Sequence, residues 1–107
     1  ALALQEKALT YLHQSALEEY KNILKAQKEG VKFTGVSGSI LQYLYIVAIS
    51  GGQVPAANKA AYAYYLSKVK ELLPTASMNT KAIAAIVLDK AGQKKEAQEF
   101  VASLKNI

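Results

Sequence analysis

The fold is decided by the stretch Ser39-Ile40-Leu41-Gln42-Tyr43-Leu44-Tyr45-Ile46-Val47-Ala48-Ile49-Ser50, in which apolar residues would cover every side of a helix. A helix without a polar face belongs in the middle of a helical assembly, where its neighbours cover it on most sides. Tyrosine, isoleucine and valine also favour strands, but the flanking segments run at helical period and a lone strand would have no partner. The run is too short for a membrane span, which needs about 20 residues. We therefore predict a central core helix.

The segment before this stretch has the spacing of an amphipathic helix. Its apolar residues recur every three or four positions, at Leu9, Leu12, Ala16, Tyr20, Ile23 and Leu24. Gly30 ends the pattern, and an unbroken helix over 4–29 would be about 39 Å long at about 1.5 Å per residue. Because that length is unusual for so small a domain, we expect a kink or break near His13-Gln14-Ser15.

Turn-forming residues separate the central helix from both of its neighbours. The segment 31–38 has the composition of a loop, and we expect its Phe33 to fold back onto the core. Either Ser37 or Ser39 is placed to cap the central helix, because a serine hydroxyl accepts a hydrogen bond from a backbone N–H in the first turn. Gly51-Gly52 is placed to end it.

The third helix is predicted between two prolines. Pro55 suits its first turn and Pro74 stops it. The side chains that form its apolar stripe are Tyr62, Tyr65, Leu66, Val69, Leu72 and Leu73. Burying them yields less free energy than ordering the helix costs, so we expect this helix to share a core with the others.

Two shorter helices are predicted in the last third of the chain. The fourth has Asn79 or Thr80 as its cap and ends at Lys90, with Gly92 as the left-handed residue beyond it. Its apolar residues are Ile83, Ile86, Val87 and Leu88, and Ala82, Ala84, Ala85 and Ala91 leave room for another backbone. The fifth opens at Lys94 and should bury Ala97, Phe100, Val101 and Leu104.

Five helices with short connections predict an all-α fold made of antiparallel helix hairpins, such as a compact helical bundle. At 107 residues the chain forms one domain, residues 1–107. It opens with Ala1-Leu2-Ala3-Leu4, which shows no signal peptide. We interpret the domain as a fragment of a much larger protein.

The composition bears on several classes of function. The formal charge of +5 comes from 13 lysines without any arginine, the residue that proteins prefer for bidentate phosphate and base contacts. Because the lysines are scattered from Lys7 to Lys105, we interpret them as solvated residues and predict no nucleic-acid partner. The absence of cysteine removes disulfides, thiolate metal sites and cysteine nucleophiles.

Few residues are candidates for chemistry. His13 has no second ligand or nucleophile at helical spacing, so we expect a partly exposed structural histidine. Glu18 and Glu19 are adjacent, which makes their side chains diverge on a helix, and Asp89 is expected at the surface. The loop 35–39 could offer N–H groups to an anion, but a connector that carries a helix cap is favoured. We therefore predict no catalytic, cofactor-binding or metal-binding residue.

Five of the seven tyrosines lie in the central and third helices. Tyr62 and Tyr65 fall on the apolar stripe and are expected in the core, with their hydroxyls reaching the surface. Tyr64 points away from that stripe. It is either a contact to a neighbouring domain or an isolated exposed aromatic residue.

Three groups of residues resemble part of the helical domain of bacterial alpha-2-macroglobulin-like proteins, particularly the large secreted forms of Bacteroides-type bacteria. They are Gln42-Tyr43-Leu44-Tyr45; Ala61-Tyr62-Ala63-Tyr64-Tyr65-Leu66 with Lys68 and Lys70; and Ala82, Ala85, Leu88, Gly92, Ala97 and Ser103-Leu104-Lys105. The resemblance spans most of the chain. It rests on packing patterns, because these segments contain no catalytic signature.

The resemblance implies an arc of an α/α-toroid from an exported protease trap, located in the periplasm or at the cell surface. Its implied partners are the neighbouring domains of the parent chain and a protease, without direct membrane insertion. The thioester of such proteins needs a cysteine and a glutamine three residues later, and this chain has no cysteine. No thioester residue is therefore carried over.

Two other classes of function compete with this interpretation. The segment from Gly92 to Phe100 is similar to the second helix of a tetratricopeptide-type hairpin, which would make the chain a helical-repeat interaction module. No fixed period recurs along the sequence to support further repeats. A small helical enzyme is disfavoured because the polar residues do not converge in the sequence pattern.

Overall fold

Helices make up the regular structure of residues 2–105, the part of the chain that the computed structural model describes. The α-helices are α1 (Leu2–Lys28), α2 (Gly38–Ile49), α3 (Lys59–Val69), α4 (Met78–Lys90) and α5 (Lys94–Lys105). Two single turns of 3-10 helix, η1 (Ala56–Asn58) and η2 (Lys70–Leu72), extend α3 at its two ends. These residues contain no strand, so the predicted all-α fold with five helices is confirmed.

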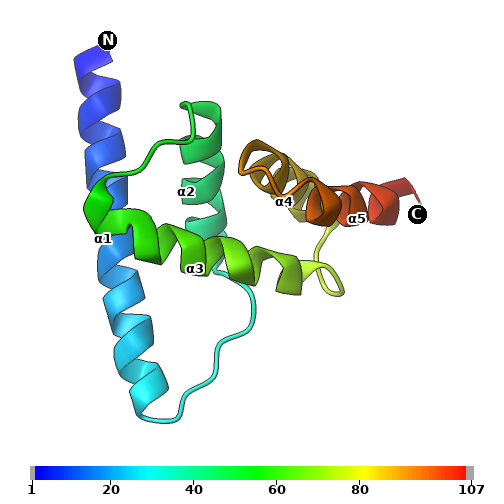
Figure 1. Cartoon of the computed structure of the whole chain (residues 1–107), viewed down its shortest axis with the longest axis horizontal. Coiled ribbons are helices and arrows are strands. Elements are labelled where there is room, and N and C mark those ends of the chain that lie inside the picture. Colours follow the sequence, from blue (N-terminus) through cyan, green and yellow to red (C-terminus); the bar gives the residue numbers. More distant parts are fainter. Residues whose placement is uncertain (1, 106–107) are drawn as a thin grey trace.

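The helices form a flat assembly, 42 × 40 × 20 Å along its principal axes. α1 and α2 run antiparallel, α3 crosses both of them, and α4 and α5 pair on the other side of α2 (Figure 1). The radius of gyration is 14.2 Å, against about 13 Å for a compact domain of this length. The two antiparallel pairs touch directly where α4 packs on α2, while α3 crosses α1 and α2, and the assembly is slightly open.

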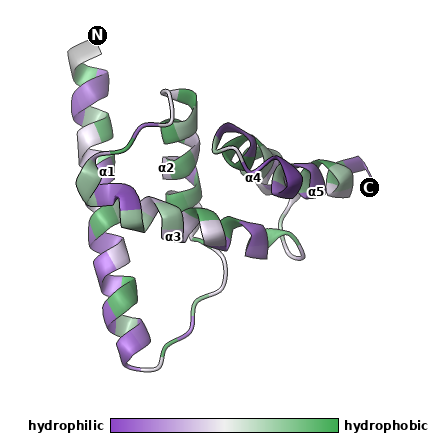
Figure 2. Cartoon of the chain, viewed as in Figure 1, coloured by the Kyte–Doolittle hydropathy of each residue, from purple (hydrophilic) through white to green (hydrophobic). Residues whose placement is uncertain are grey.

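The core is centred on α2, as the sequence predicted. Ile40, Leu41, Tyr43, Leu44, Val47 and Ala48 of this helix are all buried, and Figure 2 shows how strongly its residues are hydrophobic. Gln42 and Ile49 are exposed, so the cover is not complete. Other helices contribute Ala16, Tyr65, Val69, Val87, Leu88 and Phe100 to the same cluster. No helix within residues 2–105 is long and apolar enough to cross a membrane.

The helix caps follow the predicted chemistry, with one shift in position. Ser37 caps α2 by accepting a hydrogen bond from the N–H of Ile40 at 3.3 Å. α4 is capped by Ser77, which accepts from the N–H of Thr80 at 3.2 Å, so the predicted cap at Asn79 or Thr80 was wrong. The helix begins earlier because Ser77 has the extended backbone that an N-cap needs, with φ −69° and ψ 168°.

Gly92 has the predicted left-handed conformation after α4, with φ +84°. The N–H of Gln93 then bonds to the carbonyl of Leu88 at 2.8 Å, which closes the helix in the manner of a Schellman motif. The chain turns sharply here, and α5 packs back against α4 (Figure 1). Ala97 and Phe100 are buried as predicted, whereas Ile86 on α4 is exposed.

The first and third helices differ in detail from the predictions. α1 is unbroken over its 27 residues, so the expected kink near His13 was wrong. The His13 side chain turns inward to a partner on α2 and does not interrupt the backbone hydrogen bonds. The segment between Pro55 and Pro74 is helical as predicted, but both of its ends are 3-10 turns, and Leu72 and Leu73 are only half-buried.

Candidate functional site

A cavity of about 550 Å³ opens between α1, the following loop and α3, and we call it the α1–α3 cavity. Its volume lies within the range of about 300–1,000 Å³ that is usual for small-molecule sites. It is lined by Glu19, Asn22, Ile23 and Ala26 of α1, by residues 33–37 of the loop, and by Ile40, Tyr64 and Tyr65. Three separate segments therefore build it, which no single motif in the sequence could reveal.

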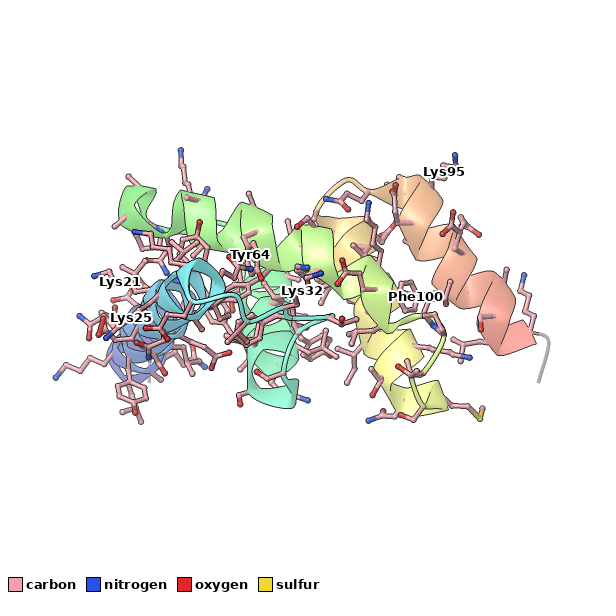
Figure 3. All side chains as sticks on the ribbon, turned by 90° about the horizontal axis from the view of Figure 1, so that it is seen from below. Lys21, Lys25, Lys32, Tyr64, Lys95 and Phe100 are labelled. Atoms are coloured by element: carbon pink, nitrogen blue, oxygen red, sulfur yellow. The ribbon has the colours of Figure 1, made fainter. Side chains whose placement is uncertain are left out.

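Aromatic rings form one wall of this cavity. Tyr64 lies with its ring centroid 5.4 Å from that of Tyr20 and 5.8 Å from that of Tyr65, in tilted and edge-on arrangements that aromatic pairs prefer. Figure 3 shows Tyr64 between α3 and α1. The sequence placed Tyr64 away from the packed stripe, but it is half-buried against its own chain because α3 crosses α1 at Tyr20.

Tyr65 fixes α3 to α1. Its ring is buried in the core as predicted, but its hydroxyl does not reach the surface, because it donates a 2.6 Å hydrogen bond to the carbonyl of Ala16. Burial raises the pKa of Tyr65 above its usual range, and the nearby Glu19 carboxylate adds to that shift. The phenol therefore stays protonated and remains a donor across the ordinary pH range.

Glu19 brings a negative charge to the α1–α3 cavity. Ser37 donates to its Oε2 atom at 3.2 Å, and the Glu19 side chain is half-buried. The neighbouring Glu18 is exposed and lies 3.9 Å from Lys21, on the outer side of the helix. The predicted divergence of the two carboxylates is confirmed. Only Glu19 faces the cavity.

In the loop 35–39, where the sequence allows an anion site but favours a connector, a backbone N–H already binds a carboxylate of the same chain. The N–H of Gly35 donates to Glu71 Oε1 at 2.8 Å, and Lys68 Nζ lies 3.3 Å from the same oxygen. The Gly35 N–H, followed by Lys68, holds the pKa of Glu71 below its usual value. Lys68 also donates to the carbonyl of Phe33 at 3.0 Å. The contacts with Glu71 and Lys68 therefore fix this loop in place as a connection between helices. The sequence alone does not indicate this role of Glu71.

A side chain at Gly35 should destabilise the fold. Its φ of +70° is left-handed, and a Cβ atom there would lie 2.6 Å from Leu72 Cδ2. We expect Gly35→Ala to lower the free energy of unfolding by about 1–3 kcal/mol, as measured by urea denaturation. Gly38→Ala is the matched control, since its Cβ would meet nothing within 4 Å, and it should be neutral or slightly stabilising. Equal stabilities of the two variants would contradict the strain argument.

A second group of polar side chains joins α1, α2 and η1 in the interior. His13 Nδ1 and the Tyr43 hydroxyl share a hydrogen bond of 2.7 Å, and Asn58 Nδ2 donates to the His13 carbonyl at 2.8 Å. His13 is only 7% exposed, so the expected partial exposure was wrong. A buried imidazole needs a partner, and Tyr43 supplies it from the adjacent helix.

Burial controls the protonation of both titratable side chains, His13 and Tyr43. Burial, with a contribution from Tyr62, raises the pKa of Tyr43 to about 12. Burial also lowers the pKa of His13 below its usual 6.5. Both side chains are therefore neutral at pH 7, and the hydrogen bond between them connects α1 to α2.

The lowered pKa of the buried His13 side chain predicts a loss of stability in mild acid. Since the folded-state pKa lies below 6.5, the unfolded chain binds a proton first as the pH falls through 6.5. We expect the free energy of unfolding to decrease there, by at most about 1.4 kcal/mol for each pH unit. Urea denaturation between pH 7.5 and 5 measures it. His13→Gln should remove the slope, and Glu71 does not interfere because its contribution is lost only below about 4.5. An identical slope in His13→Gln would refute the assignment.

An apolar groove of about 620 Å³ lies between the first half of α1 and the end of α2, and we call it the α1–α2 groove. Its lining residues are Gln5, Glu6, Ala8, Leu9, Leu12, Ile46, Ile49 and Ser50. Ile49 is 59% exposed and the adjacent Leu4 is 69% exposed. Exposed apolar side chains that lie close together, as here, are typical of a surface that packs against another domain or protein.

The remaining charged residues are at the surface. Asp89 is exposed, as predicted, and accepts a 2.7 Å hydrogen bond from Lys94. Eleven of the thirteen lysines are exposed, and Figure 3 shows Lys21, Lys25 and Lys95 projecting from the assembly. Within residues 2–105, no group of three histidine, cysteine or acidic residues could hold a metal ion.

The chain was also compared with known proteins. No protein-family model, no curated protein and no solved structure matches it.

Proposed function

We propose that the chain is a non-enzymatic structural and interaction domain of an exported alpha-2-macroglobulin-like protease trap. The observation that carries the proposal is the use of the buried polar side chains, which hold helices together. His13 bonds to Tyr43, Asn58 to the His13 carbonyl and Tyr65 to the Ala16 carbonyl, each across two elements. In the described part of the chain, every buried side-chain nitrogen and oxygen has a partner.

The proposed partners are the neighbouring domains of the parent chain. The resemblance in the central helix, in α3 and in the last two helices supports a position inside a larger helical domain. The flat, slightly open assembly and the α1–α2 groove support the same idea, since Leu4 and Ile49 leave apolar surface exposed. We assign the groove to packing against a flanking domain, and export to the periplasm or cell surface follows from the resemblance.

A tetratricopeptide-like binding module is the second candidate. The sharp turn at Gly92 and the close packing of α4 on α5 favour it, because each such repeat is one helix hairpin. Repeat hairpins stack on one another with a uniform offset. Here α4 packs directly on α2, but α3 stands between the two hairpins in the sequence and lies across α1 and α2 instead of forming a hairpin of its own (Figure 1). The arrangement therefore favours the first candidate.

The experiment uses the parent protein with its flanking domains. It is mixed in excess with an endoprotease, and the activity of the protease is assayed on a protein substrate and on a small peptide substrate. A trap should suppress cleavage of the protein substrate and spare that of the peptide, because entanglement blocks only large molecules. Retention of full activity on the protein substrate would contradict the trap.

The structural role is tested by a charge in the α1–α2 groove. Ile49→Lys should increase hydrogen exchange in the domain that packs on the groove, because a lysine cannot be buried there without a partner. Gln42→Lys is the matched control on the same helix, since Gln42 is exposed and does not line the groove. Equal exchange in both variants would show that nothing packs on this surface.

A further inference from the structure

We propose that the α1–α3 cavity binds a small organic cation, an alkylammonium group carried on a short apolar body. This inference is independent of the protease-trap proposal, because it rests only on the walls of the cavity. Those walls combine aromatic rings, aliphatic side chains and one carboxylate, contributed by α1, the loop and α3.

The first step concerns the aromatic wall. Phe33, Tyr64 and Tyr65 line the cavity, and the faces of such rings attract ammonium groups. The chain itself provides an example, since Lys68 Nζ lies 5.9 Å from the centroid of the Tyr64 ring. That lysine is neutralised by Glu71, at 3.3 Å, and is tied to the Phe33 carbonyl. Among the residues that line the cavity in the described part of the chain there is no lysine.

The second step concerns the charge. Glu19 is the charged residue among those lining the cavity, and its half-burial weakens the screening of its field by solvent. Ser37 donates to Oε2 of this carboxylate, and because both oxygens carry lone pairs, Oε1 can still accept a hydrogen bond or face a cation. A bound ammonium group would lie beside Glu19, with its apolar body against side chains such as Ile23 and Val36.

The third step distinguishes a cation from an anion. Two groups of this loop that could bind an anion, the Gly35 N–H and the Ser37 hydroxyl, are already engaged. The first donates to Glu71 at 2.8 Å and the second to Glu19 at 3.2 Å. Both donors thus serve carboxylates of the chain itself, and an added anion would have to displace one of them. Because the charged side chain that lines the cavity is the Glu19 carboxylate, the cavity favours positive ligands.

The test uses choline as the probe and 3,3-dimethyl-1-butanol as its uncharged counterpart of the same shape. Each is titrated into the ¹⁵N-labelled chain, and backbone amide shifts are followed by NMR. We expect saturable choline-dependent shifts at Gly35, Val36 and Ser37, with at least about tenfold weaker binding of the alcohol. Absence of choline binding, or equal affinity for the alcohol, would overturn the proposal. Inorganic phosphate shifting the same amides with higher affinity than choline would overturn it too.

Substitutions then locate the charge. Glu19→Gln should weaken choline binding about tenfold, because the amide keeps the hydrogen-bonding shape and loses the charge. Glu18→Gln, one residue away on the outer side of α1, should leave the affinity unchanged. Tyr64→Leu keeps an apolar side chain at the wall and should also weaken binding, which provides a readout if Glu19→Gln does not fold. Unchanged affinity in a folded Glu19→Gln or Tyr64→Leu variant would refute the site.

Discussion

Phe100→Ala is expected to lower the free energy of unfolding by about 3–5 kcal/mol. Phe100 is 1% exposed and points inward from α5 to the core cluster (Figure 3). Its removal takes away the largest buried side chain that α5 contributes and leaves a cavity between α5 and its neighbours. The alanine costs nothing in helix propensity, so the loss comes from packing alone.

Urea denaturation followed by circular dichroism measures this change. Gln98→Ala is the matched control, because Gln98 lies on the same helix, is exposed and should change the stability by less than about 0.5 kcal/mol. Phe100→Leu should fall between the two. A loss below about 1 kcal/mol for Phe100→Ala would show that α5 is not packed as described.

The number and order of the helices could be predicted from local patterns in the sequence. Apolar spacing of three and four residues locates each helix, and glycine, proline and serine mark the ends, as at Gly92 and Ser37. Such signals depend only on residues that are close in the sequence, so they can be recognised without knowledge of the tertiary contacts. The burial of α2 followed in the same way, because a segment without a polar face must be covered.

The α1–α3 cavity and the buried hydrogen bond between His13 and Tyr43 could not be predicted in that way. His13 is buried because Tyr43, 30 residues later, bonds to its ring, and Gly35 is pinned by Glu71, 36 residues later. Nothing near His13 or Glu71 in the sequence indicates these partners. Both contacts depend on how the helices cross, and α3 crosses α1 and α2 instead of continuing the pattern of hairpins (Figure 1).

Leu44→Ala is expected to lower the free energy of unfolding by about 2–5 kcal/mol. Leu44 is fully buried in the middle of α2, the helix that contacts α1, α3 and α4. Because several helices surround the site, we expect the cavity to collapse little and the loss to lie in the upper part of that range. Ile49→Ala on the same helix is the control, since Ile49 is 59% exposed and should cost far less.

The two core variants together test whether the described helices unfold as one unit. If they do, Leu44→Ala and Phe100→Ala both shift the urea midpoint and leave the slope of the transition unchanged, because the slope reports the surface exposed on unfolding. If α4 and α5 separate first, Phe100→Ala alone should split the transition or flatten it. We expect the first outcome, because Phe100 and Leu44 belong to one continuous buried cluster. A split transition would show that the α1–α2 pair and the α4–α5 pair are separate folding units.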